Sequence, residues 1–135
     1  MRIMLDTNVL ISMVFFPGKR FRQILETITT KHTLVLSSFV IEELISVAER
    51  KFPHKKEEID SFLSRLSYEM VYTPHHLKAG LFQIRDVKDY PVLYTAIIED
   101  VDIFITGDKD FDDVDIERPE ILAPSEFLEK YCYTQ

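Results

Sequence analysis

Short apolar runs rich in β-branched residues alternate along this chain with longer segments of helical periodicity. Strand patterns are predicted at residues 2–5, 33–36, 69–72, 101–106 and 121–122. Helices are predicted at residues 9–16, 21–28, 38–51, 59–66, 77–84 and 89–99, with a short one after Pro124. Strands that alternate with helices favour a mainly parallel sheet covered on both faces, a three-layer α/β/α fold. In such sheets, ligands bind beyond the carboxyl ends of the strands.

Length and composition indicate one globular domain. The chain has 135 residues, of which 46% are hydrophobic, and neither repeats nor linker-like stretches divide it. Its apolar runs are shorter than the roughly 20 residues that span a bilayer, and the first residues lack the apolar stretch of a signal peptide. The one cysteine, Cys132, cannot form an internal disulfide. We therefore expect a single domain over residues 1–135, in the cytoplasm and without a membrane segment.

Four acidic residues stand where such a fold would gather them. Asp6 follows the first predicted strand and Asp108 follows the strand at 101–106, so parallel strands would bring both to one edge of the sheet. Asp89 stands at the start of a predicted helix, and Glu43 lies about one turn into another. Each residue singly has a structural explanation, as a helix cap or part of a solvated helix face. Their coincidence at one edge favours a site.

Clustered carboxylates indicate a hard metal ion. Ionised acids that lie close together repel one another unless a cation pairs with them. Oxygen ligands suit Mg²⁺ or Mn²⁺, and the four histidines are not spaced with acids like zinc ligands. Such sites catalyse phosphoryl transfer or phosphodiester hydrolysis. The net charge of −7 argues against a protein that simply neutralises phosphates, but six of the 23 acids lie within residues 108–117.

Basic residues supply candidate contacts for a phosphate backbone. Lys19, Arg20 and Arg22 lie near the start of a predicted helix, and a second group comprises Arg50, Lys51, Lys55 and Lys56. We predict that the first group binds nucleic acid. The alternative is that both groups are solvated helix ends.

Four segments, in this order, resemble PIN-domain proteins of the kind found as VapC-like ribonuclease toxins: Ile3–Leu10, Ser37–Leu44, Arg85–Leu93 and Ile105–Phe111. The resemblance implies a PIN-like fold with metal-binding catalytic acids at Asp6, Glu43, Asp89 and Asp108. It offers Asp110 as a fifth metal ligand, and Asp86 is the rival to Asp89. By the same resemblance, the side chains that would orient carboxylates or a water are Thr7, Asn8 and Thr106.

The function implied by this resemblance is a Mg²⁺- or Mn²⁺-dependent endoribonuclease, the toxin of a toxin–antitoxin pair. It also implies an RNA substrate, a cognate antitoxin and a homodimer. Two alternatives remain open. One is a PIN-like module that binds nucleic acid or protein without activity. The other is a haloacid-dehalogenase-like phosphatase, whose Gly-Asp-x-x-x-Asp pattern matches Gly107–Asp112, although position 8 is Asn where that family needs its general acid.

Overall fold

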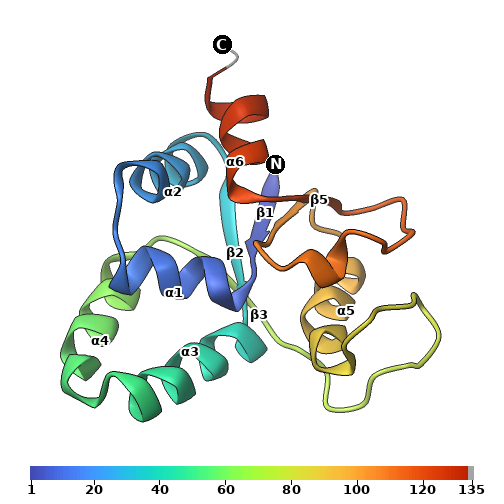
Figure 1. The fold of residues 1–135 in the computed structure, drawn as a ribbon, viewed down its shortest axis with the longest axis horizontal. Coiled ribbons are helices and arrows are strands. Elements are labelled where there is room, and N and C mark those ends of the chain that lie inside the picture. Colours follow the sequence, from blue (N-terminus) through green and yellow to red (C-terminus); the bar gives the residue numbers. More distant parts are fainter. Residues whose placement is uncertain (134–135) are drawn as a thin grey trace.

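A parallel sheet forms the centre of the computed structural model, which describes residues 1–133. Within these residues the strands are β1 (Arg2–Leu5), β2 (Thr33–Ser37), β3 (Glu69–Val71), β4 (Ile103–Ile105) and β5 (Glu120–Leu122). All neighbouring pairs are parallel, and the order across the sheet is β3-β2-β1-β4-β5 (Figure 1). The predicted parallel sheet is therefore confirmed.

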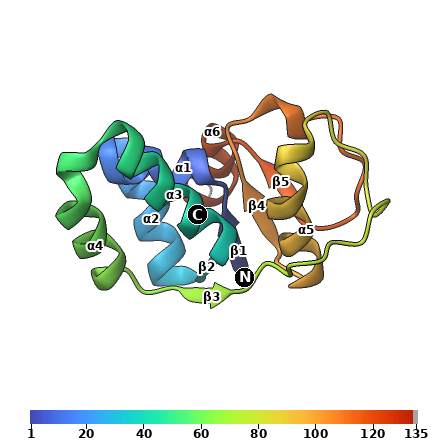
Figure 2. The same cartoon turned by 90° about the horizontal axis from the view of Figure 1, so that it is seen from below.

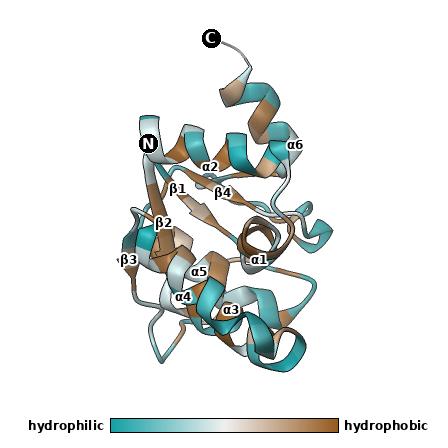
Figure 3. Ribbon diagram, turned by 90° about the vertical axis from the view of Figure 1, so that its left-hand side faces the viewer, coloured by the Kyte–Doolittle hydropathy of each residue, from teal (hydrophilic) through white to brown (hydrophobic). Residues whose placement is uncertain are grey.

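Helices cover both faces of this sheet. They are α1 (Thr7–Phe15), α2 (Lys19–Lys31), α3 (Ser38–Lys51), α4 (Lys56–Arg65), α5 (Tyr90–Ile98) and α6 (Pro124–Phe127). A π-helical turn, Leu128–Cys132, continues α6, and short 3₁₀ turns lie at Pro53–Lys55, Val87–Asp89 and Lys109–Phe111. Figure 3 shows α2 and α6 on one side of the strands and α3, α4 and α5 on the other. The three-layer α/β/α architecture is thus as predicted.

The core lies between these layers. Ile3, Met4 and Leu5 of β1 are fully buried, as expected for a central strand of a sheet covered on both faces. The exposed helix α2 buries only Ile24 and Ile28, one turn apart, which gives it the two-coloured surface visible in Figure 3. No helix among the described residues is long and apolar enough to cross a membrane.

The predicted helix at residues 77–84 is wrong. The chain there runs as an irregular segment, with Gly80 at a left-handed φ of 89°. Side chains of α5 satisfy its backbone instead: the Tyr90 hydroxyl donates to the carbonyl of Lys78 at 2.6 Å and accepts from the Leu81 N–H at 3.3 Å. Phe82 is buried and stacks on the Tyr90 ring. The periodic apolar residues therefore pack on α5 without forming a helix.

The order of the strands creates a switch point between β1 and β4. From β1 the chain moves outward through β2 to β3, and then returns to place β4 on the other side of β1 (Figure 2). The connections that follow β1 and β4 therefore leave the sheet on opposite sides. A crevice at the carboxyl ends of these two strands is the usual place for a ligand in an open α/β sheet.

Candidate metal centre

Asp6 lies at this switch point and has two structural roles. Residue Leu5 pairs with Ile105 across β1 and β4, so Asp6 and Thr106 leave the sheet side by side. One carboxylate oxygen of Asp6 accepts the N–H of Thr7 at 2.8 Å and caps α1, which begins two residues earlier than predicted. The other accepts the Thr106 hydroxyl at 2.7 Å. In the sequence, a helix cap and a site at the sheet edge are alternative explanations of Asp6. In the structure, Asp6 caps α1 and lies at the sheet edge as well.

Asp108 and Asp110 shape the turn after β4 through their hydrogen bonds. The Asp108 N–H donates to the Thr106 hydroxyl oxygen at 3.0 Å, and the Asp110 N–H donates to the Asp108 carboxylate at 2.9 Å. These hydrogen bonds connect Asp110 through Asp108 and Thr106 to Asp6. They fix the loop that carries Asp108 and Asp110 against the end of β1.

Glu43 reaches the same region from α3. The Thr7 hydroxyl donates to a carboxylate oxygen of Glu43 at 2.6 Å, which joins the first turn of α1 to the second turn of α3. The negative charge of Glu43 is close enough to Asp6 to influence its ionisation. Asn8 is exposed beside them in the first turn of α1.

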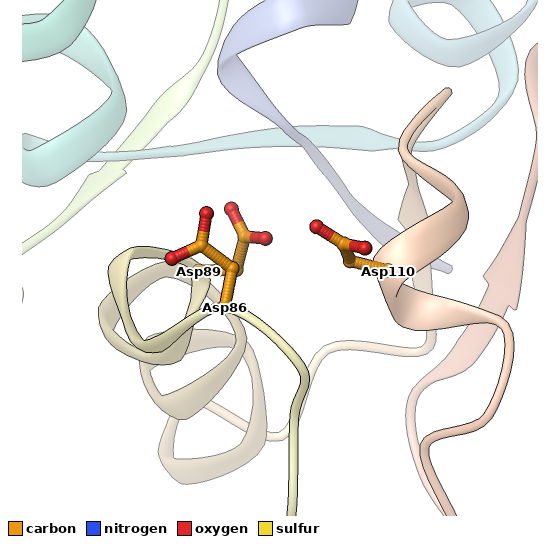
Figure 4. Close-up of side chains that lie close together, drawn as sticks. All are labelled: Asp86, Asp89 and Asp110. Carbon is orange, nitrogen blue, oxygen red and sulfur yellow. The ribbon is translucent and has the colours of Figure 1, made fainter.

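A group of three acids closes the other side of the centre. Carboxylate oxygens of Asp86, Asp89 and Asp110 all lie within 4.8 Å of one another. Figure 4 shows Asp86 and Asp89, which come from the turn before α5, facing Asp110 from the turn after β4. Asp86 and Asp89 are rivals in the sequence pattern, yet the structure brings both to this group.

Burial and like charges make two of these acids hard to ionise. Burial raises the pKa of Asp6, a residue that is only 6% exposed. The hydrogen bonds from Thr106 and Thr7 oppose that rise, and the charges of Glu43 and Asp108 add to it. Burial, followed by the charges of Asp108, Asp6, Asp86 and Asp110, raises the pKa of Asp89 to about 7.

This arrangement fits a hard divalent cation. The Asp89 Oδ2 atom is buried and lacks a hydrogen-bond partner among the described residues, so it is an acceptor that the fold leaves unsatisfied. The neighbouring donor atoms are carboxylate oxygens, the ligands that Mg²⁺ and Mn²⁺ prefer. A bound cation would relieve both the unsatisfied oxygen and the mutual repulsion of the acids.

Positive side chains have two different positions relative to this centre. Arg85 lies at its rim, 3.9 Å from a carboxylate oxygen of Asp110 and paired with Asp113. Sequence reasoning missed this residue, and its position directly before Asp86 was the available signal. By contrast, the exposed group Lys19, Arg20 and Arg22 lies beyond the far end of α1, a nine-residue helix about 13 Å long.

Comparisons with known proteins agree with this fold. A crystal structure of VapBC2 from Rickettsia felis, bound to a DNA fragment from their promoter, is similar in fold, with a TM-score of 0.70. Sequence identity is 23%, and the similarity covers 91% of this chain and 98% of that one. A search of curated proteins found no match. Residues 2–110, which contain Asp6, Glu43, Asp86, Asp89, Asp108 and Asp110, match the family model for the PIN domain, and the chain therefore belongs to the PIN-domain family.

Proposed function

We propose that this protein is a Mg²⁺- or Mn²⁺-dependent endoribonuclease. The observation that carries the proposal is the group of carboxylates at the β1–β4 switch point, three of which lie within 4.8 Å of one another. Membership of the PIN-domain family supports the same chemistry, because proteins of that family are nucleases. The proposal makes a phosphodiester of RNA the bond that is hydrolysed.

In this proposal the metal ligands are Asp6, Glu43, Asp89, Asp108 and Asp110, and Asp86 completes the acidic wall. Thr7 and Thr106 hold the carboxylates of Glu43 and Asp6 in place through the hydrogen bonds described above. A bound divalent ion supplies activation of a water and stabilisation of charge on the phosphate oxygens. The proposal also gives Asn8, exposed in the first turn of α1, the role of orienting a water or the phosphate.

The wider assignment follows from the similar structure. Because that structure is of a VapBC2 complex, we propose that this chain is the toxin of a toxin–antitoxin pair, with a cognate antitoxin protein as its partner. We also propose a homodimer and a place in the cytoplasm, where RNA substrates are present. Lys19, Arg20 and Arg22 would contact the RNA backbone some nucleotides away from the cleaved bond.

The test is cleavage of a mixed RNA pool by wild type and by the Asp6→Asn variant, in Mg²⁺ or Mn²⁺ and with a chelator. Asn removes a ligand charge but keeps the size of the side chain and the ability to cap α1. We expect cleavage to fall by about 100-fold or more, since even outer partners of metal ligands are worth 10- to 100-fold. Circular dichroism should show an unchanged fold.

The exposed acid Asp115 offers a matched control. Asp115→Asn makes the same change of charge in the acidic loop and should cleave like wild type. If Asp6→Asn also cleaves like wild type, the nuclease proposal fails at its central residue. A wild-type protein that binds RNA but never cleaves it would identify a binding module instead.

A further inference from the structure

We infer that a groove beside the acidic centre binds a nucleobase of a single-stranded RNA, stacked on Tyr72. The groove has a volume of about 660 Å³, within the range of small-ligand sites. It is lined by the first turns of α3, by the segment that follows β3 and by Pro91 of α5. This inference rests on the proposed function, because it gives the substrate of that same centre a second point of contact.

The groove and the acidic centre share two elements of the fold, α3 and the start of α5. Glu42 lines the groove and directly precedes Glu43, whose carboxylate is held by Thr7. Pro91 also lines it, two residues after Asp89. In the inferred complex, a strand with a phosphate at the acids runs along these two elements and places a neighbouring base in the groove.

The walls of the groove are fixed before any ligand arrives. The Thr73 N–H donates to the Ser38 hydroxyl at 2.9 Å, which ties the segment after β3 to the start of α3. The hydroxyls of Thr73 and Thr95 are hydrogen-bonded at 2.8 Å, and Thr95 is fully buried in α5. Figure 1 shows how this segment leaves β3 beside the start of α3 and leads toward α5. A preorganised wall loses little conformational entropy on binding.

Tyr72 supplies the stacking surface. It is 74% exposed, although Val71 before it is buried and Thr73 after it is anchored. A large aromatic ring held on a rigid backbone and turned to solvent has no packing role in the core of the protein. Such rings bind single-stranded nucleic acid by stacking on the faces of successive bases. Phe39 and His75 line the same groove and add further flat surface.

The charge around the groove suits a polyanion. Residues 71–85 contain no Asp or Glu, although the chain as a whole has a net charge of −7. The same stretch contains His75, His76, Lys78 and Arg85, all of them exposed. Arg85 is paired with Asp113, and Glu42 lines the opposite wall, so phosphates next to a base in the groove would meet the side formed by residues 71–78, where Lys78 is the positive charge.

The experiment measures binding of a short fluorescein-labelled RNA in EDTA, so that affinity is read without cleavage. The RNA is used single-stranded and annealed to its complement. Tyr72→Ala should weaken single-strand binding by about 5- to 150-fold, the range for loss of one base–aromatic stack, and should leave duplex affinity unchanged. Tyr72→Phe keeps the ring and should restore binding. Tyr133→Ala removes another exposed tyrosine, 58% exposed and outside the groove, and serves as the control.

Kinetics separate this inference from the proposed function. In Mg²⁺ or Mn²⁺, Tyr72→Ala should raise KM and leave kcat near the wild-type value, because the stack is present in both ground and transition states. If the wild type binds RNA and never cleaves it, the nuclease proposal fails and the groove stands. If Tyr72→Ala binds single strands as wild type does, the groove assignment fails. Conversion of a wild-type dimer to a monomer by Tyr72→Ala would make the groove an interface between copies and overturn the inference.

Discussion

Replacing Asp89 by Asn should stabilise the metal-free protein at neutral and alkaline pH while abolishing its affinity for divalent metal. Asp89 contributes an unsatisfied buried oxygen and a charge that faces Asp86 and Asp110. It does not cap α5 through its side chain, so Asn removes no cap. The amide of Asn also brings two donors to a place surrounded by acceptors. The acid that we propose as a metal ligand is therefore a source of instability in the empty centre.

The size of the effect follows from the pKa of Asp89. Ionising a carboxyl group whose pKa lies near 7 in the folded protein, against 3.8 for the ordinary value, costs the folded state up to about 4 kcal/mol. Asp89 is only partly buried, so water screens its charge, and we expect a destabilisation of about 1–2 kcal/mol. Relieving this destabilisation by Asp89→Asn corresponds to a rise in Tm of about 3–8 °C for a chain of this length.

The sign of the pH dependence is fixed by the raised pKa. The folded state favours the protonated form of Asp89. The fold therefore loses stability as the pH rises from 3.8, the ordinary pKa, to about 7, the pKa in the folded protein. Above that pH, Asp89 causes no further loss. Thermal unfolding of wild type and Asp89→Asn in EDTA should therefore give similar Tm values near about pH 4 and the full difference near about pH 8. Asp115→Asn, in an exposed position, controls for the change in net charge.

Added Mn²⁺ should reverse the ranking of the two proteins. At a hundredfold excess over its dissociation constant the ion stabilises wild type by about 2.7 kcal/mol through mass action, whereas the variant gains little. A stability difference that is independent of pH would refute the electrostatic reasoning. So would a Mn²⁺-induced rise in Tm of the same size in both proteins.

Two further changes test how the centre is held and how RNA reaches it. Thr106→Val removes the hydrogen bond to Asp6 and leaves the Asp108 N–H without its acceptor, so chemical denaturation should show a loss of about 1–3 kcal/mol, together with weaker metal binding by calorimetry. Lys19→Ala combined with Arg20→Ala should weaken RNA binding and flatten its dependence on salt concentration, with metal affinity unchanged, because these exposed residues lie beyond the far end of α1. An unchanged salt dependence would remove them from the RNA-binding surface.

Much of the architecture was determined by local sequence. The buried runs at 2–5 and 33–36 and the periodic helices between them specify parallel strands, because a helical crossover between strands returns the chain in the same direction. Once the strands are parallel, Asp6 and Asp108 must lie at one edge of the sheet, wherever their strands stand in it. Position relative to strand ends was therefore enough to select these two acids.

Tertiary structure alone decided which strands are neighbours and which acids meet. The pairing of β1 with β4 sets Asp6 against Thr106, a contact across a separation of 100 residues that local patterns do not encode. Likewise, Asp86 and Asp89 both face Asp110 because the turn before α5 packs beside the turn after β4.

The segment at residues 77–84 has a helical pattern, but it does not form a helix. The hydroxyls of Tyr90 and Tyr94 form hydrogen bonds with its backbone, and Phe82 stacks on the Tyr90 ring. Hydrogen bonds to distant side chains outweigh local periodicity at this place, and the same irregular segment leads from the exposed Tyr72 to the acids of the centre.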